Sequence, residues 1–404
     1  MPTFIVDVRD ARGRASKRKI EAISPEAARN ILQSKYPAIG KIRKTGFDLD
    51  LSDLGAKFAK VTVKDKAVFS RQFAAMVNAG VAIVRCLGVL SEQCPNPKLK
   101  KSLIAVSGEV QEGTNLSDSM RKHPACFDEL YISMVQAGEV GGVLDEVLNR
   151  LAKLLEDIAR LQNQIKSAMA YPMVVGFIAV LVFLGMTIFL IPIFAGIFQE
   201  LGTELPALTQ FMLWLSEILT SWKILIPIVF SIIAVFAIRQ YYKTPVGRVQ
   251  IDRLLLKLPL FGELNEKAAV ARFCRVLGTL TRSGVPILNA LDIVRDTAGN
   301  QVIANAIDAA KVEIQQGGMI SLALQKEKVF PGLAIQMISI GEETGELDSM
   351  LMKVADFYED EVEQAVKALT SIIEPVMIVV VGGMVGTILV SMYLPMFKVF
   401  DNFG

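Results

Sequence analysis

The chain has 404 residues, of which 52% are hydrophobic and 21% are charged. Charged soluble segments combined with long apolar spans would give these averages. The formal net charge of +2 provides no basic field, so we expect no nucleic-acid partner. The four cysteines form no CxxC pair and His123 is the only histidine, which argues against zinc, redox and histidine-based metal centres.

The first 48 residues predict a small α+β domain. Apolar residues alternate at its start as in a half-buried strand: Phe4, Val6 and Val8. A helix begins at Ser24-Pro25-Glu26 and continues to about Gln33. Ile39 and Ile42 indicate a last strand, and residues 49–62 are predicted as a linker. The N-terminus has no apolar core of a signal peptide, so we expect it to remain in the cytoplasm.

Three segments are predicted to cross a membrane, at residues 167–198, 218–239 and 371–398. The first and third exceed the roughly 20 apolar residues that a spanning helix needs. The second has a shorter apolar run, from Ile224 to Ile238, but Trp222, Tyr241 and Tyr242 flank it as interfacial aromatics do. We therefore expect a membrane protein with three transmembrane helices.

Loop charge orients these helices. Residues 199–217 carry three glutamates and no Lys or Arg, whereas basic residues precede the first span and follow the second. The positive-inside rule then predicts a cytoplasmic N-terminus, a periplasmic loop at 199–217 and a periplasmic tail at 399–404. Residues 240–264 are predicted as an amphipathic linker along the membrane surface.

The third span contains Gly382-x-x-x-Gly386, a spacing that lets two helix backbones approach closely. Pro172 and Pro375 begin the apolar parts of spans one and three at matching positions, and we group them with this predicted helix-packing set. No ionisable residue lies in the middle of any span. Proton and ion pathways usually need such residues, which argues against a transporter.

An internal repeat organises the rest of the chain. At a constant offset of 204, six residues of the first copy recur in the second: Phe69, Arg71, Gly80, Val81, Ile83 and Leu87 become Phe273, Arg275, Gly284, Val285, Ile287 and Leu291. After a one-residue shift, from which the offset is 203, Phe127 faces Phe330. We predict two tandem six-helix-bundle cytoplasmic domains, at residues 63–166 and 265–370, each followed by its own span. The fold class is thus an all-α membrane protein with a small N-terminal α+β domain.

Local signals define several helix ends. Thr62-x-x-Asp65 predicts a capping box before the first helix, and Gly80 predicts its C-terminal stop. Pro286 is predicted in the first turn of the next helix of the second copy. A long helix is expected from about Val143 toward the membrane.

A paired glycine–glutamate motif is the candidate functional site. It consists of Gly138, Glu139, Gly142 and Leu144 in the first copy, and Gly341, Glu342, Gly345 and Leu347 in the second. One interpretation is structural: the glycines make a sharp link between two helices, and the glutamate caps the following helix. The others are that the glutamates contact a partner protein or hold a divalent cation, although no spaced oxygen-ligand loop is visible.

With these features in order, the sequence resembles the family of type II secretion F and PilC platform proteins. The tandem domains, the three spans, the paired motifs and the segment Phe273-x-x-x-Leu277-x-x-Leu280-x-x-x-Gly284-Val285-Pro286 carry the resemblance. The first copy departs from that segment at Phe73, Met76 and Ala82. The opening FIVDVRDARGR and the segment AISPEAARNIL are also similar to the family's N-terminal domain.

The resemblance implies a bacterial inner-membrane platform that oligomerises and needs no cofactor. Its implied partners are a hexameric assembly ATPase, pilin or pseudopilin subunits, other inner-membrane assembly proteins and membrane lipids. The sequence has no GxxxxGK[ST] loop and no Ser–His–Asp arrangement, so we expect no enzyme. The alternative function is a membrane transporter or permease subunit. Pilus assembly and type II secretion are not separated, with a mild preference for the pilus.

Overall fold

The computed structural model describes residues 3–9, 15–21, 38–44, 59–200, 205–259 and 261–403. The chain divides into two compact units. One comprises Met1–Lys60 with Cys94–Lys101, and the other comprises Val61–Gln93 with Ser102–Gly404.

The first unit contains a three-stranded antiparallel sheet with the order β2-β1-β3. Its strands are β1 (Thr3–Arg9), β2 (Ala15–Glu21) and β3 (Ala38–Lys44). The alternating residues Phe4, Val6 and Val8 lie on β1, and Ile39 and Ile42 lie on β3, as predicted. The predicted helix from Ser24 to Gln33 and most of the predicted linker lie outside the described residues.

The described residues outside this sheet form helices and the turns that join them. The first copy of the repeat comprises α3 (Val63–Asn78), α4 (Ile83–Gln93), α5 (Pro97–Gln111), α6 (Leu116–Arg121), α7 (Glu129–Gly141) and α8 (Leu144–Gly185). The predicted capping box is present: Asp65 N–H donates to Thr62 Oγ1, and Thr62 N–H donates to the Asp65 carboxylate. Gly80, the predicted stop, has φ 78° directly after α3.

Helix α8 carries the chain from the bundle into the first span without a break. It continues through a π-helical turn, η1 (Met186–Leu190), into α9 (Ile191–Glu200). The π turn ends two residues before Pro192, which has no N–H for the carbonyl of Ile188. The helix therefore widens where the proline removes a hydrogen bond. The expected boundary at 166/167 lies inside this continuous helix.

The segment predicted as the 199–217 loop contains much of another helix. Helix α10 (Ala207–Thr220) follows Pro206, and apolar side chains let it pack on the spans. The short 3₁₀ helix η2 (Trp222–Ile224) then leads into α11 (Leu225–Tyr242), the second predicted span. Helix α12 (Pro245–Lys257) occupies the predicted amphipathic linker.

The second copy repeats the order of the first. Its helices are α13 (Phe261–Arg282), α14 (Ile287–Thr297), α15 (Gln301–Gln315), α16 (Ile320–Glu327), α17 (Gly332–Thr344) and α18 (Leu347–Phe403). Pro286 is the N-cap of α14 rather than part of its first turn. Its extended backbone, with ψ 137°, leads into the helix instead of belonging to it.

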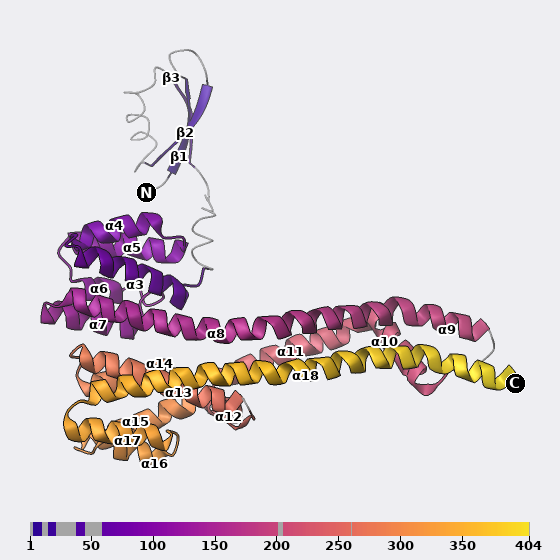
Figure 1. Ribbon diagram of the computed structural model, residues 1–404. Helices are drawn as coiled ribbons and strands as arrows, with labels where there is room; N and C mark the ends of the chain where they lie inside the picture. Colours follow the sequence, from indigo (N-terminus) through magenta and orange to yellow (C-terminus); the bar gives the residue numbers. More distant parts are fainter. Residues whose placement is uncertain are drawn as a thin grey trace. The chain divides into compact units, whose positions relative to one another are not determined.

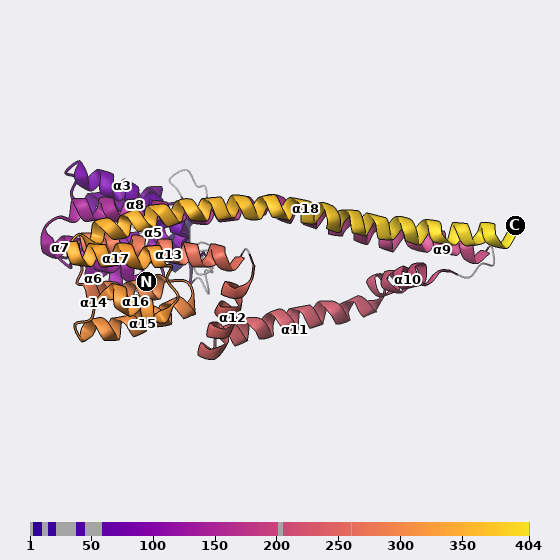
Figure 2. The same cartoon turned by 60° about the horizontal axis from the view of Figure 1, so that its bottom comes forward.

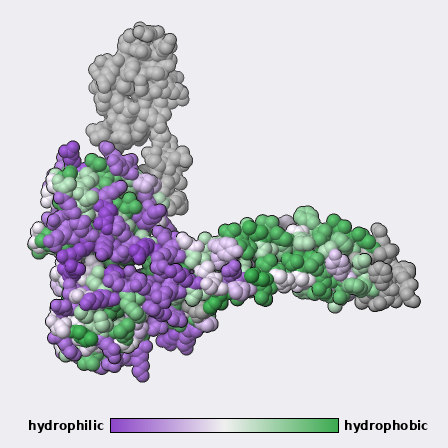
Figure 3. Space-filling view, in the orientation of Figure 1, coloured by the Kyte–Doolittle hydropathy of each residue, from purple (hydrophilic) through white to green (hydrophobic). Residues whose placement is uncertain are grey.

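The two long helices α8 and α18 lie side by side and run in the same direction (Figures 1 and 2). Aromatic residues form the centre of each bundle: Phe69 stacks on Phe73 in the first copy, and Phe273 packs against Phe330 in the second. In Figure 3, polar residues cover the short helices, whereas hydrophobic residues cover the far part of the long helices.

Among the described residues, three helical stretches have the length and apolar composition needed to cross a membrane. They are Leu144–Ile197, Leu225–Tyr242 and Leu347–Phe397. Each overlaps one of the three spans predicted from the sequence, and the outer two also include the long helix that leads to the span. The second begins at Leu225 rather than at residue 218, because residues 218–220 are the end of α10.

Candidate functional site

The paired glycine motif makes a tight turn between α7 and α8, and again between α17 and α18. Gly142 and Gly345 adopt left-handed backbone conformations, with φ 68° and 76°, directly after α7 and α17. Side chains other than glycine rarely adopt this conformation. In the first copy the Val143 N–H then donates to the carbonyl of Gly138, at 3.0 Å, and closes the helix end. The sharp link expected from the glycines is present in both copies.

The first glycine and the leucine of each motif form one close contact between helices. A Cβ atom at Gly138 would lie 3.1 Å from Leu144 Cα, and one at Gly341 would lie 2.9 Å from Leu347 Cα. Real Cβ atoms essentially never show a contact under 3.0 Å, so the distance at Gly341 is too short for a side chain. A side chain at Gly341 would therefore force the backbone of α18 to shift, and one at Gly138 would require its neighbours to move by a few tenths of an ångström, because the next helix starts directly against each glycine.

Glu139 caps a helix, but not the one that we predicted. Its carboxylate accepts hydrogen bonds from Leu116 N–H at 2.6 Å, from Ser117 N–H at 3.0 Å and from the Ser117 hydroxyl at 2.5 Å. These groups belong to the N-terminus of α6, which precedes α7 in the chain. The prediction that Glu139 caps the following helix α8 was wrong, because its side chain leaves α7 on the face that packs on α6.

Glu342 has the same role in the second copy. Its carboxylate accepts hydrogen bonds from Ile320 N–H at 2.5 Å and from Ser321 N–H at 2.9 Å, at the N-terminus of α16. A carboxylate at this position satisfies free N–H groups and complements the positive end of the helix dipole. Each glutamate thus ties the last turn of one helix to the first turn of the helix before it.

Both carboxylates therefore accept hydrogen bonds from groups of the chain itself. The exposed part of the turn between α7 and α8 is apolar. Val140, next to Glu139, is 85% exposed. Across the described residues, no three His, Cys, Asp or Glu side chains come close enough together to hold a metal ion. Contact with a partner at these turns remains a prediction.

An arginine–carboxylate pair joins the first helix of each copy to its long helix. Arg71 on α3 donates through Nε to Glu156 on α8, at 2.6 Å, and Arg275 on α13 donates through Nε to Glu359 on α18, at 2.8 Å. The hydrogen bond from Arg71 lowers the pKa of Glu156 below its usual value. We noted the recurring arginines in the sequence but missed their partners, which occupy matching positions of the repeat.

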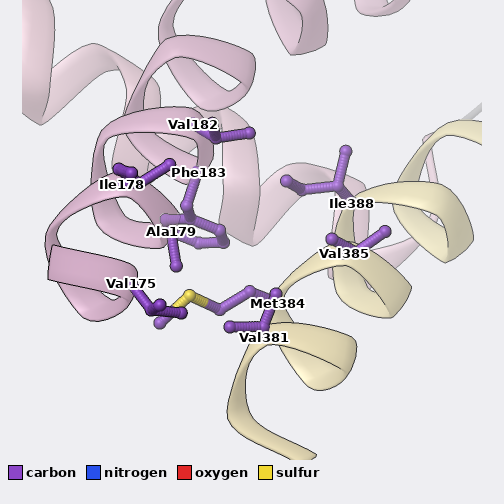
Figure 4. Close-up of a pocket in the computed structure, with 9 residues that line it drawn as sticks. All are labelled: Val175, Ile178, Ala179, Val182, Phe183, Val381, Met384, Val385 and Ile388. Atoms are coloured by element: carbon purple, nitrogen blue, oxygen red, sulfur yellow. The ribbon is translucent and has the colours of Figure 1, made fainter. Parts of the chain in front are cut away.

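An apolar pocket of about 290 Å³, open on one side, lies between spans one and three (Figure 4). Nine side chains of α8 and α18 line it: Val175, Ile178, Ala179, Val182, Phe183, Val381, Met384, Val385 and Ile388. Gly176 lies beside this contact, where an added Cβ would meet Met377 Cε at 3.4 Å. By contrast, a Cβ at Gly382 or Gly386 would meet no described atom within 4 Å. The predicted Gly382–Gly386 packing face is therefore open, and its partner remains a prediction.

Pro172 and Pro375 lie inside the continuous helices α8 and α18 and end neither helix. A later proline explains a contact that sequence reasoning missed. The Thr209 hydroxyl on α10 donates to the Ser391 carbonyl on α18, at 2.7 Å. That carbonyl would normally pair with the N–H of residue 395, which is proline and has none. A side chain from another helix thus satisfies the orphaned carbonyl.

Comparison with known proteins identifies the family. The model for "Type II secretion system (T2SS), protein F" matches twice, at residues 69–192 and 273–395. The chain is 42% identical to the type IV pilus assembly protein PilC of Myxococcus xanthus, over 98% of this chain and 94% of that protein. It is 43% identical to PilC of Thermus thermophilus, over 99% and 98%.

A secretion protein is also similar: the type II secretion system protein F of Vibrio cholerae is 32% identical, over 98% of each chain. The two matches of the family model each begin inside the first helix of a copy and cover the rest of that copy and most of the span that follows it. Together with the three apolar helices, these findings show that the chain belongs to the type II secretion F and PilC family of multi-pass inner-membrane proteins.

Proposed function

We propose that this chain is the inner-membrane platform of a type IV pilus machine, or of the closely related type II secretion system. In this role it couples a cytoplasmic hexameric ATPase to the insertion of pilin-like subunits into a filament. The higher identity to proteins named for pilus assembly, 42% and 43% against 32%, favours the pilus.

Helix continuity is the observation that best supports this proposal. Helix α18 contains 57 residues and passes from the second bundle through the third span without interruption. At 1.5 Å per residue it is about 85 Å long. A displacement imposed on the bundle would reach the membrane through a rigid rod, and α8 with its extensions provides a second one.

The proposed organisation follows the predicted domains. Two six-helix bundles and the N-terminal α+β domain lie in the cytoplasm, and the segment after span one and the C-terminal tail lie in the periplasm. The positive-inside charge pattern supports this orientation. The glycine–glutamate turns make each bundle rigid at the point where its long helix begins, which supports a mechanical role for them. The chain acts as a scaffold without its own catalysis or cofactor.

Affinity purification from mildly solubilised membranes tests the partners. We expect the chain to retain a hexameric assembly ATPase and pilin-like proteins, whose identities would separate pilus assembly from secretion. Other inner-membrane assembly proteins and bound lipids should accompany them. If repeated purifications instead recover a substrate-binding partner, and liposomes containing the chain show solute flux, the permease alternative replaces the platform.

A pair of glycines in α18 tests the rigid rod. Lys367→Gly with Thr370→Gly removes about 1 kcal/mol of helix preference per position relative to alanine, between the bundle and the span. The matched control, Lys367→Ala with Thr370→Ala, removes the same side chains and keeps the helix. We expect the glycine pair to lower filament assembly while ATPase co-purification and membrane level stay unchanged. Equal assembly by both variants would refute transmission through α18.

A further inference from the structure

The two copies of the repeat meet through different faces. Helix α8 of the first copy packs against α13 and α18 of the second, and α7 contacts α14. Across this interface Arg150 Nη1 donates to the carbonyl of Arg282, at 2.5 Å. Leu154 of α8 and Thr279 of α13 border the same small cavity, of 80 Å³.

Helices α8 and α18, which are counterparts in the repeat, pair with each other along their length. The rest of this arrangement is heterologous, because the first copy uses its α7–α8 face and the second uses its α13–α14 face. The faces left over are the part of the α17–α18 face that does not meet α8, in the second copy, and the α3–α4 face of the first. A heterologous contact can be repeated by further units, since each unit presents one free face of each kind.

The α17–α18 face is apolar and uncovered. Leu154 on α8 is 1% exposed, whereas its counterpart in the second copy, Phe357 on α18, is 46% exposed. On α7, Leu130 is 4% exposed, whereas its counterpart Leu333 on α17 is 44% exposed. Ile340 on α17 is also exposed. The same face of the bundle is thus covered in one copy and open in the other.

The complementary face is open on the first copy. Ile293 on α14 is 4% exposed, and its counterpart Val89 on α4 is 36% exposed. Thr279 on α13 is buried, whereas the matching Ala75 on α3 is exposed. The two open faces therefore match the two halves of the interface already present inside the chain.

We propose that a second copy of this chain docks its α3–α4 face onto the α17–α18 face, in the geometry that joins the two internal copies. Leu154 and Thr279 lie near each other in the internal interface, so their counterparts Phe357 of one chain and Ala75 of the other pack together in the proposed contact. Lys353 then approaches the carbonyl of Asn78, as Arg150 donates to that of Arg282.

The membrane limits what this contact can build. Helices α8 and α18 run in the same direction (Figure 1). The rotation that superposes one copy on the other, applied to a whole chain, therefore keeps its spans in the same orientation across the bilayer. Repetition then turns about an axis along the membrane normal, which favours a ring of chains over an open filament. The proposal rests on the platform role proposed above, and it gives the oligomerisation that the family resemblance implies a defined surface.

Cross-linking of two differently tagged chains tests the contact. One chain carries Ala75→Cys and the other carries Phe357→Cys, co-expressed in membranes that lack the assembly ATPase and pilins. A short bismaleimide should join the two tags, while each variant expressed alone gives no product. A chain carrying both substitutions should form a ladder of covalent multimers. The parent chain, with its native cysteines, is the background control.

The outcomes separate the alternatives. Self-cross-linking of the Phe357→Cys chain alone would show a two-fold symmetric contact and overturn the proposal, as would absence of any product between the two tags. Phe357→Glu should also reduce the oligomer on a native gel, whereas Val312→Glu, at an exposed apolar residue of α15 outside this face, should not. Since no ATPase or pilin is present, failure here leaves the proposed coupling function untouched.

Discussion

Replacing Glu139 by alanine should loosen helix α6 and leave its counterpart α16 unchanged. The substitution removes the acceptor for the N–H groups of Leu116 and Ser117 and for the Ser117 hydroxyl. Both residues are buried, so water cannot readily replace the carboxylate. The helix should then open more often from its N-terminal end.

The magnitude follows from the kind of hydrogen bond that is lost. Hydrogen bonds to a charged group contribute about 1.5–3 kcal/mol each, and loss of an N-terminal cap typically costs about 0.5–2 kcal/mol. We expect a local loss of about 1.5–3 kcal/mol, since the remaining contacts of α6 persist. This corresponds to a rise in the local opening equilibrium of roughly 10- to 160-fold.

Hydrogen–deuterium exchange of the full chain in detergent measures this opening. Peptides covering Leu116–Arg121 should exchange faster in Glu139→Ala, while peptides covering Ile320–Glu327 should match the parent. Glu342→Ala should give the reverse pattern, so the repeat provides an internal control. Glu139→Gln, which keeps one acceptor oxygen without the charge, should fall between the parent and the alanine variant.

Unchanged exchange of both helices in both alanine variants would refute the capping role. If Glu139→Ala kept parental exchange but no longer retained a partner in membrane purifications, the glutamate would instead be a contact residue. Faster exchange at the start of α8, with α6 unchanged, would restore the role first expected from the sequence.

Two further substitutions test the close contacts. Gly341→Ala should destabilise the detergent-solubilised chain by about 1–3 kcal/mol, because the new Cβ would overlap Leu347 Cα. Gly382→Ala is the matched control: its Cβ would meet no described atom within 4 Å, so the thermal midpoint should equal that of the parent within error. Thr209→Val leaves the Ser391 carbonyl without its donor and should cost about 1–3 kcal/mol, seen as a lower thermal midpoint. Equal midpoints for the two glycine variants, or a parental midpoint for Thr209→Val, would contradict these explanations.

Local chemistry made much of the fold predictable. The capping box at Thr62, the stop at Gly80 and the turn at Gly142 depend on residues within a few positions of each other. The membrane spans depend on the length of an apolar run, which needs no knowledge of neighbouring helices. The repeat was visible because matching residues recur at a nearly constant offset.

Errors arose where the partner is distant in the chain. Glu139 lies close to the start of α8 in the sequence. A carboxylate at the end of α7 can cap either the start of α8, which follows it, or the start of α6, which precedes α7. Packing of α6 on α7 selected the partner 23 residues upstream. Helix α10 was missed for a related reason: its short apolar pattern is informative only once spans one and three offer a surface to cover.

The sequence by itself determined which residues are apolar, where glycine ends a helix and that one helical segment occurs twice. Only the tertiary structure decided which apolar face is covered. Leu154 and Phe357 occupy matching positions and are both apolar, yet only Leu154 is buried. Helical periodicity identifies a face that can exclude water, but burial depends on whether another helix lies against it, and that contact is made between segments far apart in the chain.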